Sequence, residues 1–355
     1  MKKRLCLLLA VLMLLTLTAC KDGPPGETTG TTATIPATAP TQPTVPETTA
    51  PTVPTQPTEP PEMHTVWLWT EQKLTKAEGG AGTYTREYDS LGRMIQDAYA
   101  SADGKTSYHY SYTYDEADRI LTYEEYDSRY ATGRTEYTYD ATGRLTKEIY
   151  SNTENYSSQT EYTYTTDGKI AEKVTVSGKN KDRTLYTYDA NGNLIREAQT
   201  VSHNDRVTEN NAVDYTYDEA GNKLTKTESR EGTPLRVEEW TYSEAGQVLT
   251  YRELDGAGNV GEGLKYVYYP DGKVDEECFY IADTEELVTY YLYDDAGRVT
   301  KRASGKRYKY INVTEMTLYT YDENGNLLTE ITTEKDGTEL SRNEYTYISM
   351  EVPVK

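Results

Sequence analysis

Pairs of aromatic residues separated by one polar residue recur along most of this chain. In Tyr137-Thr138-Tyr139 both rings fall on one face of a strand and the threonine on the other, because side chains of a strand alternate. Asp140 to Gly143 then place Asp at the first and Gly at the fourth position of a type I turn. A glycine there can take the left-handed conformation that closes a short hairpin, and Leu145 resumes the apolar face. The pattern therefore predicts a β-hairpin.

This hairpin pattern occurs ten times, at steps of 24 to 29 residues, and an eleventh, incomplete copy ends the series. The turn positions of the ten copies are Gly92, Asp118, Gly143, Gly168, Gly192, Gly221, Gly246, Gly272, Gly297 and Gly325. Four residues before each turn position, and again in the last copy, lies a tyrosine of what we call the tyrosine column: Tyr88, Tyr114, Tyr139, Tyr164, Tyr188, Tyr217, Tyr242, Tyr268, Tyr293, Tyr321 and Tyr347. Six residues before the turn lies Arg86 in the first copy and an aromatic residue in all others. A fixed period of this kind indicates a repeat array.

Successive copies are joined by a second kind of connection, often with glycine, and the variation in repeat length falls there. We expect an all-β fold of tandem antiparallel hairpins that forms a curled ribbon, an open shell or a spiral, because so many strands cannot stay flat. The tyrosines should lie inside. A single copy buries too little to fold alone, so neighbours must stack and the ends need caps. Val66 to Trp69, with Arg86 in place of an aromatic residue, fits an N-terminal cap.

The front of the chain has a different composition. Residues 1–20 combine Lys2, Lys3 and Arg4 with a short apolar run and then Leu17-Thr18-Ala19-Cys20, which is similar to a bacterial lipoprotein signal. This resemblance implies lipidation of Cys20, export, and a membrane anchor that leaves the repeats outside the cytoplasm; an ordinary secretory signal is the alternative. Residues 21–62 hold 11 of the 14 prolines and many threonines, so we interpret them as a disordered linker. Residues 63–355 form the repeat domain.

The charge of the chain excludes one class of partner. The formal net charge is -21, and removal of the signal with its three cations shifts it to -24. Nucleic acids need a cationic partner, so we expect no nucleic acid binding. After removal of the signal, Cys278 is the one cysteine besides Cys20, which excludes an intrachain disulfide if Cys20 carries lipid.

No residue pattern announces a catalyst, a metal site or a cofactor. The three histidines lie in unrelated contexts. The acidic pairs Glu124-Glu125, Glu238-Glu239 and Glu276-Glu277 resemble the two carboxylates of a glycosidase only in being close in sequence. Asp189 to Asn193 and Asp322 to Asn326 have oxygen ligands that suit calcium, but their glycine comes too early for an EF-hand, and side-chain hydrogen bonds within the turn explain them better.

Three tryptophans are the best single candidates for stacking on a sugar ring: Trp67, Trp69 and Trp240. Core packing competes with this role at Trp240, which occupies a repeat position, and a cap competes at the other two. The variable connections, including residues 251–264 and 304–314, are further candidates for ligand contact.

The phrase Tyr-x-Tyr-Asp-x-x-Gly-Arg-Leu, intact at Tyr137 to Leu145 and nearly so at Tyr186 to Leu194 and Tyr319 to Leu327, resembles the YD repeat of the Rhs family. The resemblance covers about residues 80–350. It implies hairpin ribbons wound into hollow shells, which enclose a C-terminal effector in large toxins and serve adhesion in teneurin-like proteins; carbohydrate binding is also associated with them. Few residues follow Tyr347, so we expect no effector domain.

These observations favour a non-catalytic, cell-surface protein for adhesion or for binding a glycan or protein ligand. The first alternative is a shell or scaffold component of an Rhs-like toxin system. The second alternative is an envelope glycan hydrolase.

Overall fold

The computed structural model describes residues 63–76, 80–282, 284–307 and 311–354, all within the unit Pro60–Lys355. The regular structure of these residues is β-strand throughout, so the all-β prediction is confirmed. The predicted signal, Cys20 and the linker lie outside the described residues.

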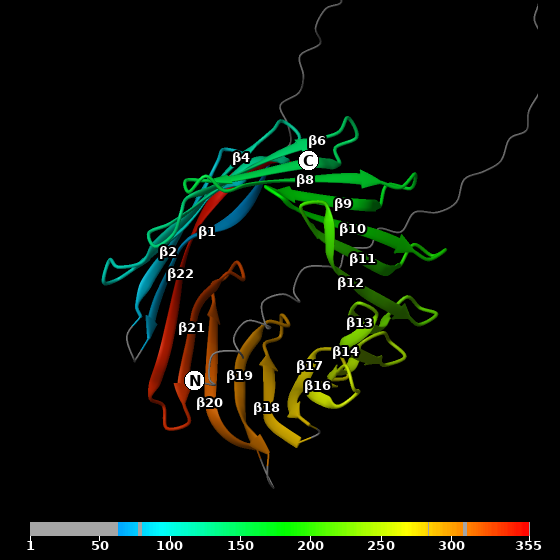
Figure 1. Ribbon diagram of the computed structural model, residues 1–355. Coiled ribbons are helices and arrows are strands. Elements are labelled where there is room, and N and C mark those ends of the chain that lie inside the picture. The colour runs from blue at the N-terminus through cyan, green and yellow to red at the C-terminus, as the bar shows by residue number, and fades with distance from the viewer. Residues whose placement is uncertain (1–62, 77–79, 283, 308–310, 355) are drawn as a thin grey trace, which may run out of the picture. The chain divides into compact units, whose positions relative to one another are not determined.

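The 22 strands are β1 (Met63–Lys76), β2 (Gly82–Tyr88), β3 (Met94–Ser101), β4 (Ser107–Tyr114), β5 (Ile120–Asp127), β6 (Gly133–Tyr139), β7 (Leu145–Asn152), β8 (Ser157–Tyr164), β9 (Ile170–Ser177), β10 (Asn180–Tyr188), β11 (Leu194–His203), β12 (Arg206–Tyr217), β13 (Lys223–Arg230), β14 (Thr233–Tyr242), β15 (Val248–Asp255), β16 (Val260–Tyr268), β17 (Val274–Ile281), β18 (Thr284–Tyr293), β19 (Val299–Arg307), β20 (Ile311–Tyr321), β21 (Leu327–Glu334) and β22 (Glu339–Pro353). Each strand pairs antiparallel with the next strand in the sequence, as in a continuous chain of hairpins. The strands follow one another around a ring (Figure 1).

The sheet closes on itself, because β22 pairs with β1. This pairing joins 13 residue pairs, from Met63 opposite Pro353 to Lys76 opposite Ser341, whereas β1 pairs with β2 over only four residues. Curling was predicted, but closure goes beyond the curled ribbon, open shell or spiral that we expected. A closed sheet has no free edge at which further chains can add.

The turn chemistry follows the repeated Asp and Gly. In the third copy the Gly143 N–H donates to the Asp140 carbonyl at 3.0 Å, and Asp140 Oδ1 accepts from the N–H groups of Thr142 and Arg144. Gly143 has a φ of 88°, the left-handed conformation that favours glycine, and Asp118 takes its place in the second copy at 61°. Every repeat hairpin also contains a bulge just before the column tyrosine, as between Thr138 and Tyr139.

The two faces of the sheet are the ones that the pattern predicted. In β6 the exposed Thr138 lies between the half-buried Tyr137 and Tyr139. We call the face that carries the tyrosine column the tyrosine face and the opposite one the threonine face. On the threonine face, threonines of paired strands share hydrogen bonds of 2.6–2.7 Å in four hairpins, between Thr113 and Thr122, Thr216 and Thr225, Thr241 and Thr250, and Thr320 and Thr329.

The tyrosine column locks each copy to the one before it. Tyr139 Oη donates to the Ile120 carbonyl at 2.7 Å. This bond lies beyond the last backbone pair of β5 and β6, Thr122 opposite Glu136, and so extends the contact between the two copies. The same bond, to the residue at the start of the previous copy's second strand, recurs at Tyr114, Tyr164, Tyr188, Tyr217, Tyr242, Tyr268, Tyr293 and Tyr321, while Tyr88 donates to Trp69 of β1. A phenylalanine cannot make this bond, which explains why every position of the column is tyrosine.

The basic residue after the turn glycine strengthens the same junction. Arg144 Nε donates to Asp140 of its own turn at 2.8 Å, and its guanidinium lies 4.7 Å from the ring centroid of Tyr164 in the next copy. Arg93, Arg119, Lys169, Lys273 and Arg298 stack on the next column tyrosine in the same way.

We expect Tyr139→Phe to lower the free energy of unfolding by about 1 kcal/mol, because the Ile120 carbonyl loses its donor while the ring remains. Urea unfolding followed by circular dichroism measures the change. Tyr130→Phe is the control, since Tyr130 is 72% exposed and should leave stability unchanged. Equal stability of the two variants would contradict the locking role of the hydroxyl.

Strand β1 is not the cap that we expected; it is the strand that closes the ring. Arg86 stacks on Trp69 of β1, with 3.9 Å between the guanidinium and the ring centroid. A Cβ added to Gly92 would lie 3.1 Å from Val352 of β22 and within 4 Å of Val66 and Leu68 of β1. The first copy departs from the repeat pattern because it packs against this seam.

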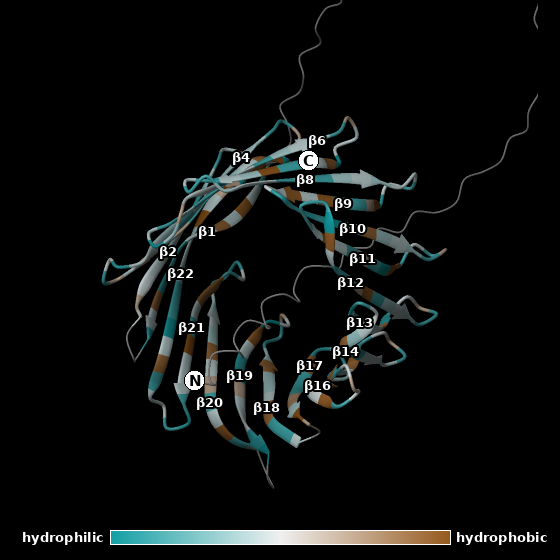
Figure 2. Cartoon of the chain, viewed as in Figure 1, coloured by the Kyte–Doolittle hydropathy of each residue, from teal (hydrophilic) through white to brown (hydrophobic). Residues whose placement is uncertain are grey.

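Few side chains of the closed sheet are fully buried. Among the described residues, the buried hydrophobic side chains are Cys278, Val288, Ala303 and Val352. Hydrophilic and hydrophobic residues alternate along the strands (Figure 2). At about 4.8 Å per strand, 22 closed strands have a circumference of roughly 105 Å and a diameter of roughly 34 Å, more than inward side chains can fill. The sheet is therefore a hollow shell.

Candidate functional site: the inner wall of the shell

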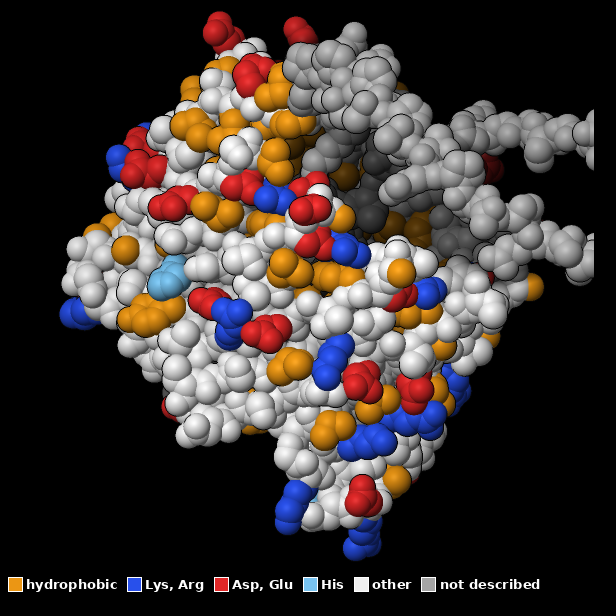
Figure 3. Space-filling view, turned by 90° about the horizontal axis from the view of Figure 1, so that it is seen from above, with side chains coloured by type: hydrophobic (Ala, Val, Ile, Leu, Met, Phe, Trp, Pro, Cys, Tyr) orange, Lys and Arg blue, Asp and Glu red, His pale blue; other side chains and the backbone are white. Residues whose placement is uncertain are grey.

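The tyrosine face lines the inside of the shell. Side chains converge on a concave face and diverge on a convex one, and the aromatic residues of the tyrosine face are half-buried, as at Tyr137 and Tyr139. Large apolar side chains on the threonine face remain well exposed, for example Leu292 at 43% and Leu318 at 46%. The face seen in Figure 3 carries acidic, basic and hydrophobic side chains interspersed with one another. We therefore treat the inner wall of the shell as the main candidate site.

Tyrosines and carboxylates make up much of this wall. Tyr215 Oη donates to Glu197 Oε1 at 2.6 Å, and Tyr251 Oη donates to Glu253 Oε1 at 2.6 Å. Burial raises the pKa of the Glu277 carboxyl, while Arg302 and a hydrogen bond from Tyr266 act in the opposite direction. Phenol hydroxyls and carboxylates can hold a polar or cationic ligand by hydrogen bonds and charge.

A network of ion pairs crosses the wall between β13, β14 and β15. Lys226 Nζ lies 2.7 Å from Glu228 and 3.0 Å from Glu238, and Arg236 lies 3.2 Å from Glu238 and 2.5 Å from Glu253. Two cations face three carboxylates, so the network stiffens the wall and keeps a net charge of -1.

Six tyrosines form the largest aromatic cluster, which we call the tyrosine platform. It extends over β2 to β5, with neighbouring ring centroids 4.6–5.8 Å apart: Tyr84, Tyr99, Tyr108, Tyr110, Tyr123 and Tyr112. Only Tyr112 belongs to the two aromatic positions of the repeat. We did not identify this platform from the sequence. Counting alternate residues from Tyr88 and Tyr114 places four of the six on one face, but the bulge in each hairpin is what brings Tyr99 and Tyr123 to the same face.

The three tryptophans do not form a common site. Trp67 and Trp69 lie on β1 beside the seam, where Trp67 is 44% exposed and Trp69 packs under Arg86. Trp240 lies on β14 and packs against Tyr251, with ring centroids 5.4 Å apart and the ring planes tilted by 43°. Trp69 and Trp240 therefore have packing partners, but β1 closes the ring and is not a cap.

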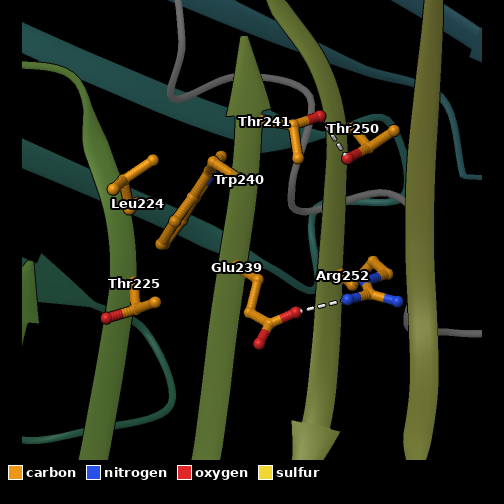
Figure 4. Close-up of a pocket in the computed structure, with 7 residues that line it drawn as sticks. All are labelled: Leu224, Thr225, Glu239, Trp240, Thr241, Thr250 and Arg252. Carbon is orange, nitrogen blue, oxygen red and sulfur yellow. Dashed lines mark hydrogen bonds and ion pairs between the residues drawn. The ribbon is translucent and has the colours of Figure 1, made fainter. Parts of the chain in front are cut away.

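Trp240 borders a shallow depression of about 360 Å³ between β13, β14 and β15. Around it, Thr241 and Thr250 share a hydrogen bond and Glu239 pairs with Arg252 at 2.5 Å (Figure 4). A second depression, of about 310 Å³, lies over β9 to β12 and includes Lys173, Asp182, Thr184, Tyr186 and Glu197. Both are shallow and lined by many polar groups, unlike the enclosed apolar pockets that hold small molecules.

The sheet separates the acidic pairs that a glycosidase would need. Glu238 pairs with Lys226 on the tyrosine face, whereas its neighbour Glu239 pairs with Arg252 on the other face. Consecutive strand residues point to opposite faces, and the same holds for the other two pairs. Two carboxylates on opposite sides of a sheet cannot flank one glycosidic bond.

The Asp and Asn turns bind their own backbone, as predicted. Asp189 Oδ1 accepts from the N–H groups of Asn191 and Asn193, and Asp322 does the same with Asn324 and Asn326. In the described part of the chain, no group of three or more His, Cys, Asp or Glu side chains is arranged to hold a metal ion. Nor does that part contain a helix long and apolar enough to cross a membrane. Of the variable connections, residues 304–314 lie partly outside the described residues, and residues 251–264 form β15, a tight turn and the start of β16.

We expect alkaline pH to unfold the shell. Burial raises the pKa of all eleven column tyrosines above the ordinary value of 10. Above pH 10 the folded state then binds more protons than the unfolded state, so stability is intact below pH 10 and falls as the pH rises towards the folded pKa values. Tyrosinate absorbance and the circular dichroism signal, recorded on one sample during titration, should change together. Tyrosines that ionise near pH 10 while the strand signal persists would contradict this.

Comparison with known proteins shows which repeat families the chain resembles. Residues 111–268 match the family model described as Teneurin YD-shell, and residues 261–282 and 315–335 match a MORN repeat variant. No protein of curated function matches the chain.

Several solved structures are similar to this chain at low identity. The crystal structure of TcdB2-TccC3 matches with 17% identity over 74% of this chain and 15% of that chain, at a TM-score of 0.41. The Photorhabdus luminescens Tc holotoxin pore matches with 14% identity over 75% and 15% of the two chains, at a TM-score of 0.35. A porin-like protein from Bacteroides uniformis matches with 11% identity over 79% and 98%, at a TM-score of 0.29. The chain thus spans about 15% of the length of the two toxin structures. The family match over residues 111–268 and the hairpin repeated around the tyrosine column together show that the chain carries the YD repeats of this family.

Proposed function

We propose that this protein is a non-catalytic shell that holds a polypeptide partner inside its closed ring of hairpins, as a shell component of an Rhs-like toxin system. The observation that carries the proposal is closure: the 13 residue pairs between β1 and β22 convert a ribbon into a container. The half-exposed lining of tyrosines and carboxylates supports it, because a packed core would bury these side chains.

Adhesion or glycan binding, which the sequence favoured, gains no support from the structure. Of its candidate tryptophans, Trp69 packs under Arg86 and Trp240 packs against Tyr251, and Trp67 lies on β1, apart from Trp240 on β14. The hydrolase alternative is weakened, because the two residues of each acidic pair lie on opposite faces of the sheet. The YD-shell match favours the container over both.

Export and lipid anchoring are part of the same proposal. They rest on the residues 2–20 pattern and on Cys20, and they place the shell at the end of a Thr/Pro-rich linker outside the cytoplasm. The mass of the mature N-terminus tests them: a diacylated or triacylated Cys20 is expected, and an unmodified N-terminus elsewhere would contradict the anchor.

Photo-crosslinking in the native cells tests the container. A photo-reactive phenylalanine analogue replaces either Thr184, on the inner wall, or Thr187, exposed on the threonine face of the same strand β10. A container predicts a defined polypeptide adduct from position 184 and none from 187, and the trapped polypeptide should resist protease until the shell is unfolded. An adduct from position 187 alone would identify an adhesin-like outer surface, and the absence of any adduct from 184 would refute an enclosed partner.

A further inference from the structure

The repeat architecture does not require the tyrosine platform. The tyrosine column and the aromatic residue two positions before it account for the junctions between copies, and Tyr112 is the platform's one member from these positions. The equivalents of Tyr84 and Tyr110 in later copies include Thr135, Thr160 and Thr184, which fold into the same hairpins. The five additional tyrosines therefore need another explanation.

Two glycines make room for the platform and its neighbours. A Cβ on Gly82 would lie 2.5 Å from the Tyr99 ring, and a Cβ on Gly133 would lie 2.6 Å from Glu125 Oε1 and 2.7 Å from Tyr150 Oη. Both glycines lie at the start of a strand and have ordinary φ angles, so neither is needed for a left-handed backbone conformation. Their lack of a side chain leaves room for the neighbouring side chains. Glycine inside a strand often marks a place where large groups or ligands lie close to the backbone.

The charge at the platform is negative. Glu125 accepts from Tyr123 Oη at 3.4 Å and from Tyr150 Oη at 3.3 Å, and in the described part of the chain no cation forms an ion pair with it. Asp97 faces Arg86 at 3.5 Å, and that guanidinium also stacks on Trp69. The platform thus has one carboxylate without a cation beside a run of half-exposed rings.

We propose that the tyrosine platform and Glu125 bind a basic, extended segment of the enclosed polypeptide, with Lys or Arg side chains over the tyrosine rings. The rings attract cations through their faces, and Glu125 supplies the charge that offsets them. A chain with a net charge of -21 complements a basic partner. This inference rests on the proposed function, since it names the kind of segment that the container holds.

The test is binding of fluorescent, unstructured peptides to the full chain, followed by anisotropy. Three peptides of equal length are compared, rich in Lys and Arg, in Glu, or in Ser and Gly. We expect saturable binding of the basic peptide only, weakened by salt. Binding of all three alike, or of none, would overturn the inference.

Variants locate the binding. Tyr110→Ser and Glu125→Gln should each weaken the basic peptide by about tenfold, the loss expected for one cation–π contact or one charge pair, whereas Tyr110→Phe should bind as the parent does. Tyr126→Ser is the matched control, because Tyr126 lies on the threonine face of β5, beside Glu125, and stacks on His109. Unchanged affinity in Glu125→Gln, which keeps the shape of the side chain, would overturn the inference even if Tyr110→Ser proved unstable.

The two proposals fail in different ways. If the inner-wall crosslink at Thr184 forms but the three peptides do not differ, the container remains and the basic specificity is wrong. If no crosslink forms, the container itself is wrong.

Discussion

Deletion of β1, residues 63–76, is expected to lower the melting temperature by about 10 °C or more and to produce oligomers. The deletion removes 13 residue pairs with β22 and the stack of Arg86 on Trp69. It also leaves β2 and β22 as free edges whose backbone groups can pair with other molecules. Differential scanning calorimetry and light scattering after gel filtration measure both effects.

The control for this deletion is His64→Ala, which changes an exposed residue of β1 and leaves the strand in place. It should melt with the parent and stay in the same oligomeric state. A deletion variant that melts at the parent's temperature without new oligomers would show that the ring does not depend on its seam.

Tyr139→Ala and Tyr188→Ala are expected to lower the free energy of unfolding by about 2–4 kcal/mol each, while Thr138→Ala changes it little. Each alanine removes a ring at the junction of two copies, its hydrogen bond to the previous copy, and the stacking partner of Arg119 or Lys169. The rings are half-buried, so the cost lies below that of a fully enclosed aromatic side chain. Urea unfolding of the three variants measures the differences, and equal stability would refute the assignment of the faces.

The sequence predicted the hairpin well because the chemistry of each copy is local. Asp140 and Gly143 determine the turn, and the alternation of Tyr137, Thr138 and Tyr139 determines the faces. At the position equivalent to Leu145, the sixth copy has Lys223 and not an aliphatic residue. The Lys223 carbonyl still accepts the hydroxyl of Tyr242, since that bond uses the backbone and not the side chain.

Closure could not be predicted, because it depends on how much twist and curl accumulate over 22 strands. The sequence of β1, which lacks the repeat phrase, indicated that this end of the array is special. It did not distinguish a cap from a closing strand, because the partner strand lies at the other end of the chain. Only the structure shows the register between β1 and β22, in which Trp69 lies opposite Tyr347.

The candidate site was predicted least well. Tryptophans drew attention as rare residues, whereas Tyr84, Tyr99 and Tyr108 were hidden among 35 tyrosines. Only the structure shows that β2 to β5 bring them together, and that Glu125 lies beside them without an ion-pair partner among the described residues.

Disulfide formation across the seam tests the closed ring most directly. In the full chain with its three native cysteines replaced by serine, Lys73→Cys and Glu344→Cys place thiols on exposed partner positions of β1 and β22. A closed shell predicts rapid, intramolecular disulfide formation, whereas Lys73→Cys with Lys265→Cys on β16, which does not pair with β1, should stay reduced. Failure of the Lys73 and Glu344 positions to link within one molecule would show that the repeats form an open ribbon.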